Sequence, residues 1–155
     1  MQNISELMSS YQRYHTKAIT QATHFIGVPC IVFSIQVALG WFLISFHSIS
    51  ISFAWIAVII LAIYYFLLDI VIGSVTVFFL ILLTYFAQCI THHHFSSMGL
   101  MIFLSTFIVG WVAQFMGHCF EGNRPAFTDN ILQVFVAPVF LVTELLLALR
   151  LKKSL

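Results

Sequence analysis

Long apolar segments dominate this sequence and decide what it can fold into. Five runs approach the length of about 20 residues that a helix needs to cross a membrane. They extend over residues 25–46, 51–68, 70–90, 98–117 and 131–149. Of the 155 residues, 61% are hydrophobic and 7% are charged, whereas about a quarter of the residues are charged in a soluble domain. The sequence therefore predicts an all-α, polytopic membrane protein built as a helical bundle.

A single integral membrane domain over residues 1–155 is expected, because no linker, low-complexity tract or internal repeat divides the chain. The net charge of +1 excludes the strongly basic surface of a nucleic-acid-binding protein. The three cysteines are odd in number and show no CxxC spacing, so no disulfide framework is expected. The region before the first run lacks the features of a signal peptide, and this run is expected to be retained.

Two features of these runs set the predicted number of crossings at four to five. Asp69 separates the second run from the third, and a charge at the bilayer centre is costly. We therefore expect a turn over residues 69–74, with Gly73 supplying the backbone freedom. Pro138 lies in the middle of the last run, where it removes a helical hydrogen bond. That segment is expected either to cross with a kink or to insert only part of the way.

Counting crossings places five polar side chains at one membrane face, although they lie far apart in the sequence. His15 and His24 lie at or before the start of the first run, Asp69 lies between the second and third, and His118 and Glu121 follow the fourth. Consecutive crossings return the chain to the same face at every second turn. These residues are therefore predicted to share one face.

The remaining histidines fall at the opposite face by the same count. His47 lies in the short loop SFHSIS and is expected to be solvated. The run of histidines at 92–94 looks suited to a metal, but adjacent residues point in different directions and lie across the bilayer from His118. We exclude these histidines from the predicted site.

Membrane orientation depends on the last segment. Arg13, Lys17 and Arg124 lie at the predicted site face, and three more basic residues follow the last run, at positions 150, 152 and 153. If the last run crosses, three basic residues lie at each face and the positive-inside rule gives no orientation. If it does not cross, all six basic residues share one face. We expect the site face to be cytoplasmic, in the inner membrane of a bacterium or in the endoplasmic reticulum membrane of a eukaryote.

The end of the fourth run carries a candidate metal site. At 100° per residue, Gln114, His118 and Glu121 fall on one stripe of a helix. An imidazole and a carboxylate three residues apart suit Fe, Mn or Zn, and Gln114 is placed to hold the His118 ring by a hydrogen bond. Capping of a helix end at the membrane interface is the alternative for the same pair.

The N-terminal stretch adds further candidates. Tyr11 and His15 are four residues apart and share a helical face. His15 and His24 are nine apart, so they can face one ion only if the helix bends between them. His24 stands where the first run enters the membrane, and a neutral backbone partner there is the alternative to a metal.

Four segments carry a resemblance to a known family. In chain order they are YHTKAITQATHFIGVP, YYFLLD, WVAQFMGHCFEGNRPAFTDN and VAPVFLVTE, and the resemblance covers residues 11–144. The chain resembles a family of small membrane proteins of bacteria and fungi whose characterised members are iron-dependent 2-hydroxy fatty acid dioxygenases. The part around QFMGHCFEGNRPA is the most specific. Ala18 and Thr20 depart from the pattern, since they stand where Pro and Asn are usual.

This resemblance implies an Fe(II) enzyme that uses O2 to remove one carbon from a 2-hydroxy fatty acid, a step of fatty acid α-oxidation. The functional histidines of the family correspond to His15, His24 and His118, and Glu121 lies in the same motif. Thr20, like the Asn that it replaces, is expected beside these ligands, in the layer of supporting groups that also includes Tyr11 and Gln114.

The substrate chemistry assigns two more residues. Arg124 is expected to hold the substrate carboxylate by a bidentate pair, and Asp69 is expected to orient a ligand or take a proton. The 17 phenylalanines supply an apolar wall for the acyl tail. A site at the membrane interface would let a lipid enter from the side while its head group stays wet.

Two other classes of protein fit parts of the pattern. Paired histidines on membrane helices also bind haem in electron carriers. A scaffold or small transporter would use Asp69 and the histidines as a proton or metal path. The concentration of Glu121, Arg124 and Asp129 in one loop suits a polar head group and favours the dioxygenase. No pattern in the sequence indicates the oligomeric state or the substrate chain length.

Overall fold

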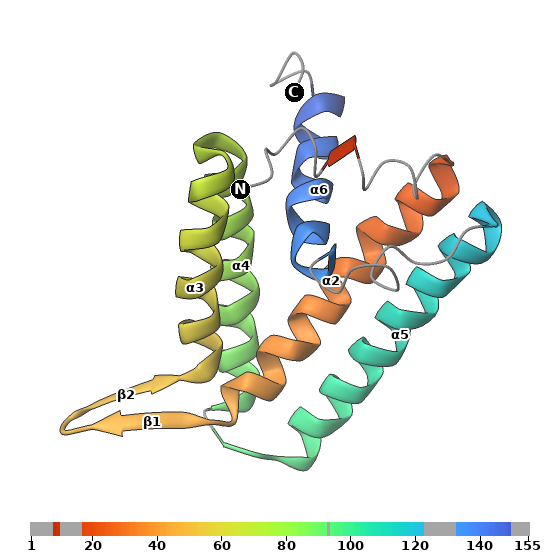
Figure 1. The fold of residues 1–155 in the computed structure, drawn as a ribbon. Helices are drawn as coiled ribbons and strands as arrows, with labels where there is room; N and C mark the ends of the chain where they lie inside the picture. Colours follow the sequence, from red (N-terminus) through yellow and green to blue (C-terminus); the bar gives the residue numbers. More distant parts are fainter. Residues whose placement is uncertain (1–7, 10–16, 93, 123–132, 150–155) are drawn as a thin grey trace.

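The protein is a bundle of helices with one β-hairpin, as the computed structural model of the chain shows (Figure 1). The structure describes residues 8–9, 17–92, 94–122 and 133–149. In chain order, its elements are α2 (Ala18–Gly40), β1 (Leu43–Phe46), β2 (Ile49–Ser52), α3 (Phe53–Leu68), α4 (Ile70–Thr91), α5 (Ser97–Glu121) and α6 (Gln133–Ala148). The most extensive contacts join α2 to α5 and α3 to α4, so two antiparallel helix pairs form the frame.

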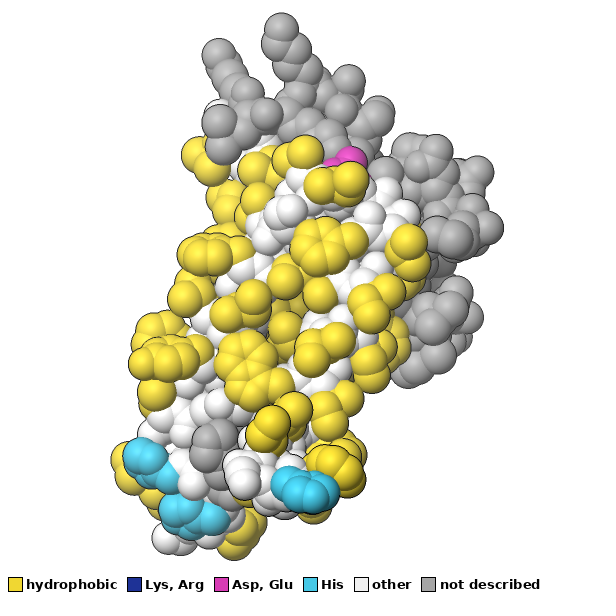
Figure 2. All heavy atoms as spheres, turned by 90° about the vertical axis from the view of Figure 1, so that its left-hand side faces the viewer, with side chains coloured by type: hydrophobic (Ala, Val, Ile, Leu, Met, Phe, Trp, Pro, Cys, Tyr) yellow, Lys and Arg dark blue, Asp and Glu magenta, His cyan; other side chains and the backbone are white. Residues whose placement is uncertain are grey.

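The helices form a membrane-spanning bundle. α2, α4 and α5 are each long and apolar enough to cross a membrane, whereas α3 and the segment Val134–Ala148 are apolar but shorter. A helix of 16 residues, such as α3, is about 24 Å long, against a hydrocarbon core of about 30 Å. Large hydrophobic side chains are exposed along the helices and cover the face shown in Figure 2. A surface this apolar suits lipid, and the chain is an integral membrane protein.

The chain turns between α3 and α4 at Asp69, as the sequence predicts, but the turn is tighter than expected. Asp69 is the single residue between the two helices, and its Oδ1 accepts a hydrogen bond of 2.9 Å from the Ile72 amide. The prediction that Gly73 supplies backbone freedom in the turn is wrong, because Gly73 lies inside α4. A Cβ at Gly73 would lie 2.7 Å from the Tyr65 carbonyl oxygen, so this glycine permits close helix packing instead.

A β-hairpin follows α2, where the sequence predicts the end of a helix and a loop. β1 pairs with β2 in antiparallel register, with Ile44 opposite Ile51 and Phe46 opposite Ile49. The strict all-α prediction is therefore wrong for residues 43–52. The reason is a period of two in LISFHSISIS: isoleucine and phenylalanine alternate with serine, which suits a strand better than a helix. The first helix accordingly ends at Gly40 rather than near Phe46.

α6 extends along only part of the length of the bundle (Figure 1). Its first turn lines a cavity together with Ile35 and Gln36 of α2 and Ala57 of α3, which lie in the halves of these helices nearer the hairpin. Its later residues line another cavity with Phe25, near the start of α2. Figure 1 shows the same course, from mid-bundle to the end where α2 begins. Of the two options left open for the Pro138 segment, this course favours partial insertion over a full crossing.

The contact of α6 with α3 is made in the buried core. The Tyr65 hydroxyl donates a hydrogen bond of 2.8 Å to the Phe135 carbonyl oxygen, in the first turn of α6. Pro138, three residues later, has no amide to give to this helix. Phe140, Tyr65 and Ile72 are each 1% exposed or less. α6 therefore fills the space between the two antiparallel helix pairs.

Candidate active site

Small residues bring α2 and α5 close together. A Cβ added at Gly27 would lie 2.9 Å from the Gly110 carbonyl oxygen, and one at Gly110 would lie 3.0 Å from the Gly27 carbonyl oxygen. A Cβ at Gly117 would collide with the Thr23 hydroxyl and lie 3.4 Å from atoms of the His24 ring. Membrane helices commonly meet through such residues. Two glycines seven residues apart on α5 are a sequence signal for this contact that the predictions above did not use.

This close approach places His24 of α2 against His118 of α5. The ring centroids are 5.0 Å apart, and the ring planes meet at 84°. His24 is 1% exposed and His118 is 6% exposed. The crossing count placed both histidines at one membrane face; the structure brings them into direct contact.

The backbone of α2 fixes the orientation of the His24 ring. Its Nδ1 lies 2.7 Å from the Thr20 carbonyl oxygen. A carbonyl oxygen only accepts, so Nδ1–H donates, and the neutral ring keeps its lone pair on Nε2. Metal-binding histidines are typically held in this way through the other ring nitrogen. Since the acceptor is a backbone oxygen, the bond is the same whether residue 20 is Thr or Asn.

Glu121 connects the end of α5 to the start of α2. Its Oε2 accepts hydrogen bonds from the Thr20 hydroxyl at 2.5 Å and from the Lys17 amide at 3.1 Å. The Lys17 ammonium donates to the Phe120 carbonyl oxygen at 2.6 Å. A carboxylate is favourable at a helix N-terminus, where it meets unpaired amides and the positive end of the helix dipole. Glu121 thus provides the interfacial capping that was the alternative to a metal, and it caps a different helix from its own. The sequence did not predict that Lys17 would bond to the end of α5.

Thr20 joins the carboxylate to the histidine pair. Its side chain is completely buried, and its hydroxyl lies 3.1 Å from the Gly117 carbonyl oxygen as well as 2.5 Å from Glu121. Its carbonyl oxygen accepts from His24. Thr20 therefore lies between His24 and Glu121, in the neighbourhood where the sequence predicts a supporting residue.

Gln114 lies one turn before His118 on α5 and is 9% exposed. Its side chain packs against α2. A Cβ added at Gly27 would lie 3.1 Å from the Gln114 Cγ and 3.3 Å from the Gln114 Nε2. The contacts described for Gln114 are thus with α2 and not with the His118 ring. The predicted hydrogen bond between Gln114 and His118 is not among them.

The other predicted site residues divide into two groups. Tyr11, His15 and Arg124 lie outside the described residues. Asp69 lies at the same end of the bundle as His24, but at the α3–α4 turn on the opposite side of it (Figure 1), where it caps α4. A crossing count determines the membrane face of a residue and not its lateral position, so it could not separate Asp69 from the histidine pair.

The described histidines at the opposite end of the bundle are exposed, as was predicted for His47. His47 lies at the hairpin, and His92 and His94 lie in the connection from α4 to α5. Histidines gather at the lower end of the view in Figure 2. The rings of His92 and His94 stack with centroids 6.4 Å apart. His93, between them, lies outside the described residues.

The described part of the chain supplies two imidazoles to one place but not a complete metal site. Within it, no group of three or more His, Cys, Asp or Glu side chains is arranged to hold a metal ion. A further ligand at this pair has to come from another segment. His15, the remaining histidine predicted for this face, precedes α2 by three residues.

Known proteins resemble this chain over nearly its full length. Residues 1–149 match the family model described as 2-hydroxy-palmitic acid dioxygenase Mpo1-like. The chain is also 34% identical over 155 residues to the 2-hydroxy-palmitic acid dioxygenase MPO1 of Saccharomyces cerevisiae, an alignment that covers 94% of this chain and 83% of the yeast protein. No solved structure matches it. On this similarity over nearly the full length, the chain belongs to the Mpo1-like family of 2-hydroxy-palmitic acid dioxygenases.

Proposed function

We propose that this protein is a non-haem iron dioxygenase that shortens 2-hydroxy fatty acids by one carbon with O2. Family membership supports the reaction class and the 2-hydroxy acid substrate. The observation that carries the site assignment is the buried contact of His24 with His118 near one end of the bundle. There a polar head group can reach the imidazoles while the acyl tail stays among apolar helices.

The donor groups of this end fit an iron ion. Neutral imidazoles are suitable ligands for Fe(II), and the Thr20 carbonyl oxygen fixes the orientation of the His24 ring, as a partner of the other ring nitrogen typically does for a metal-binding histidine. We assign His24 and His118 as ligands and His15 as the third; Glu121, first expected to bind the metal, instead accepts from Thr20 and Lys17 and caps α2 beside them. An iron ion bound by the three histidines would supply the centre for O2 activation.

Protein groups around the pair have separate tasks. We propose that Arg124, three residues after Glu121, holds the substrate carboxylate by a bidentate pair. Thr20 and Lys17 keep the Glu121 carboxylate at the start of α2 and so maintain the distance between the two histidine-bearing helices. Asp69 caps α4 on the other side of the bundle, which favours a structural role over the proton transfer first expected of it.

We further propose that the site face is cytoplasmic. Because α6 returns toward the end where α2 begins, Lys17 and the ends of α5 and α6 belong to one face. All six basic residues of the chain precede α2 or follow α5 or α6 in the sequence. By the positive-inside rule, such a face remains in the cytoplasm.

The haem electron carrier is less consistent with this geometry. A porphyrin with two axial histidines lies between their rings, whereas these two rings are in edge-to-face contact at 5.0 Å. An intense Soret band in the purified protein would support haem and contradict the non-haem assignment.

The proposed reaction is tested with purified, iron-loaded protein and 2-hydroxypalmitic acid. We expect O2 uptake and, by mass spectrometry, a fatty acid that is one carbon shorter. A protein that retains its iron but leaves the 2-hydroxy acid unchanged under O2 would contradict the proposed function. A non-hydroxylated fatty acid of the same length serves as the substrate control.

A further inference from the structure

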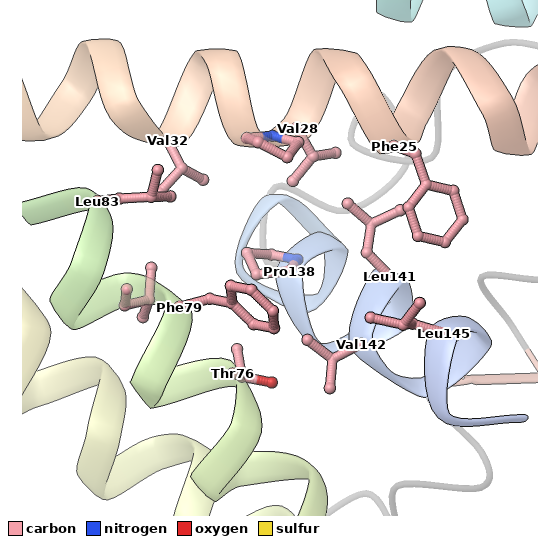
Figure 3. Close-up of a pocket in the computed structure, with 12 residues that line it drawn as sticks. Phe25, Val28, Val32, Thr76, Phe79, Leu83, Pro138, Leu141, Val142 and Leu145 are labelled. Carbon is pink, nitrogen blue, oxygen red and sulfur yellow. The ribbon is translucent and has the colours of Figure 1, made fainter. Parts of the chain in front are cut away.

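A cavity of about 330 Å³ lies between α2, α4 and α6. Figure 3 shows Phe25, Leu141 and Leu145 at one end of it and Val32 with Leu83 at the other. A volume of this size lies within the range of about 300–1,000 Å³ typical of small-molecule sites. The partial insertion of α6 creates the cavity, because α6 supplies the third wall.

The wall of this cavity is apolar. Apart from Thr76, every side chain that lines it is a hydrocarbon or aromatic group. The Thr76 hydroxyl donates to the Ile72 carbonyl oxygen of its own helix at 2.8 Å. With its one proton used in this way, Thr76 gives the cavity little to bind a polar ligand. The cavity therefore suits a hydrocarbon chain.

The cavity begins close to the histidine pair. Phe25 follows His24 directly on α2. Val28 lies four residues, about one turn, after His24 and on nearly the same face of the helix as His24. A fatty acid with its head group at His24 would thus pass Val28 as its tail enters the bundle. The head-group site and the cavity therefore lie against neighbouring faces of α2.

A second cavity, of about 270 Å³, continues in the same direction. The two cavities share the lining residues Val32, Leu80 and Pro138, here called the neck. Beyond the neck lies Gln36, which is 3% exposed and whose Oε1 has no hydrogen-bond partner among the described residues. An unpaired buried amide is an unfavourable neighbour for a terminal methyl group. The two cavities together form what we call the apolar lane, which accordingly ends near Gln36.

The length of this lane matches an ordinary lipid chain. Phe25 and Gln36 are eleven residues apart on α2, or about 16 Å of helix. One leaflet of the hydrocarbon core, half of about 30 Å, is about 15 Å deep. A long-chain acyl tail therefore fits between the head-group site and Gln36.

We propose that the cavity between α2, α4 and α6 binds the acyl tail of the 2-hydroxy fatty acid, and that a long tail passes the neck of Val32, Leu80 and Pro138 and ends near Gln36. This inference rests on the proposed function. Because the tail leaves lipid rather than water, moving it into the protein gains little from the hydrophobic effect. Chain-length preference then comes from steric fit at the neck.

The first test narrows the neck with Val32→Phe and uses Val109→Phe as the matched control, since Val109 is 53% exposed on α5. The measurement is kcat/KM for saturated 2-hydroxy acids that differ by two carbons. We expect Val32→Phe to lower kcat/KM for the longest acids at least about tenfold relative to shorter ones, the effect of an overpacked apolar site. The preferred length should move by two or more carbons in this variant alone. The same profile in both variants would overturn the proposal.

A second test needs no variant and keeps the proposal falsifiable if Val32→Phe does not fold. A 2-hydroxy fatty acid with a photoreactive group near the end of its tail is cross-linked to the wild-type protein, and the labelled peptides are identified. We expect labels on α3 and α6 around Leu61 and Phe135, which line the cavity that contains Gln36. Labels confined to α5 would overturn the tail site, and so would equal labelling by a probe without the 2-hydroxyl group, which would indicate a general lipid site.

The two proposals fail in different ways. If the wild-type protein converts no 2-hydroxy acid, the proposed function fails whatever the cross-linking shows. If conversion is normal but the chain-length profiles of the Val32→Phe and Val109→Phe variants coincide, the function stands and the tail site is wrong.

Discussion

The two ends of the helix bundle both carry histidines, but they hold them differently. At one end, His24 and His118 come from two helices, are almost fully buried and meet at 5.0 Å, with the His24 Nδ1 bonded to a backbone carbonyl. At the other end, His92 and His94 are exposed and stack at 6.4 Å. Although the histidines at 92–94 are denser in the sequence, the buried pair has the surroundings of a functional site.

Support from neighbouring groups accounts for this difference. Near the buried pair, Glu121, Thr20 and Lys17 connect the ends of α2 and α5 by four hydrogen bonds that involve these side chains and the Gly117 and Phe120 carbonyls. Near the exposed pair, the His94 Nδ1 lies 3.0 Å from the His92 carbonyl oxygen, a contact within one short connection. A ring fixed between two helices keeps its position when a ligand binds, whereas a ring on a connection does not.

The largest effect is expected from removing either member of the buried pair. His24→Ala or His118→Ala should lower turnover of 2-hydroxypalmitic acid at least about a hundredfold, because loss of a ligand exceeds the 10- to 100-fold effect typical of groups that only support one. The apolar helices should still fold, so circular dichroism and detergent-solubilised yield should stay near wild type. Normal turnover by His118→Ala would remove this residue from the site.

Glycines at the two ends provide the next comparison. Gly27→Ala should destabilise the protein by about 1–3 kcal/mol, because its Cβ would lie 2.9 Å from a backbone oxygen of α5. A Cβ at Gly40, toward the hairpin end, would lie 3.2 Å from the Thr91 hydroxyl. Gly40→Ala should cost less, because a side chain can move away and a backbone oxygen cannot. Thermal denaturation in detergent should show a clear loss for Gly27→Ala and a smaller one for Gly40→Ala. Turnover should fall only where the α2–α5 contact is disturbed, and equal effects would contradict this view of the contact.

Thr20 tests whether hydrogen bonds between α2 and α5 support the histidine pair. Thr20→Val removes the buried hydroxyl that donates to Glu121 and should lower iron affinity about 10- to 100-fold, as for other groups that position a ligand. Thr20→Asn restores a donor and should recover most of the affinity. Iron titration of both variants is the measurement. If Thr20→Val binds iron like the wild type, the support of the pair does not depend on this side chain.

Arg124 is predicted to act on the substrate and not on the metal. Arg124→Gln should raise KM about tenfold or more with iron retained, since a charge-assisted pair contributes about 1.5–3 kcal/mol. Arg124→Lys should recover part of this loss, because an ammonium lacks the planar fork of a guanidinium. Arg150→Gln is the control and should leave KM unchanged. An unchanged KM in Arg124→Gln would leave carboxylate recognition to the metal.

Much of the membrane topology could be predicted from the sequence because it follows from apolar length. The break at Asp69 and the shared face of His24, Asp69 and His118 depend only on where charges interrupt hydrophobic runs. The hairpin was missed because its residues are as hydrophobic as those of a helix, and only the alternation with serine distinguishes them. The partial insertion of α6 depends on packing against Tyr65 and α4, which apolar length does not encode.

The shared face of His24 and His118 could be predicted from the sequence, but the arrangement of the side chains around them could not. A helical stripe on α5 indicated His118 and Glu121, yet the stripe could not show that Glu121 would bond to Thr20 on another helix. The lateral separation of Asp69 from the pair, and the apolar cavity beside α2, arise from how four helices pack around α6. Such contacts between distant segments leave little trace in a single sequence.

The central claim is that the buried end of the bundle, and not the exposed end, binds the catalytic iron. The direct measurement is the iron content of purified protein after loading with Fe(II), compared among the wild type, His118→Ala and the double variant His92→Ala, His94→Ala. We predict that the wild type and the double variant retain iron at the same stoichiometry and that His118→Ala loses it. Iron retained by His118→Ala but lost from the double variant would contradict the account.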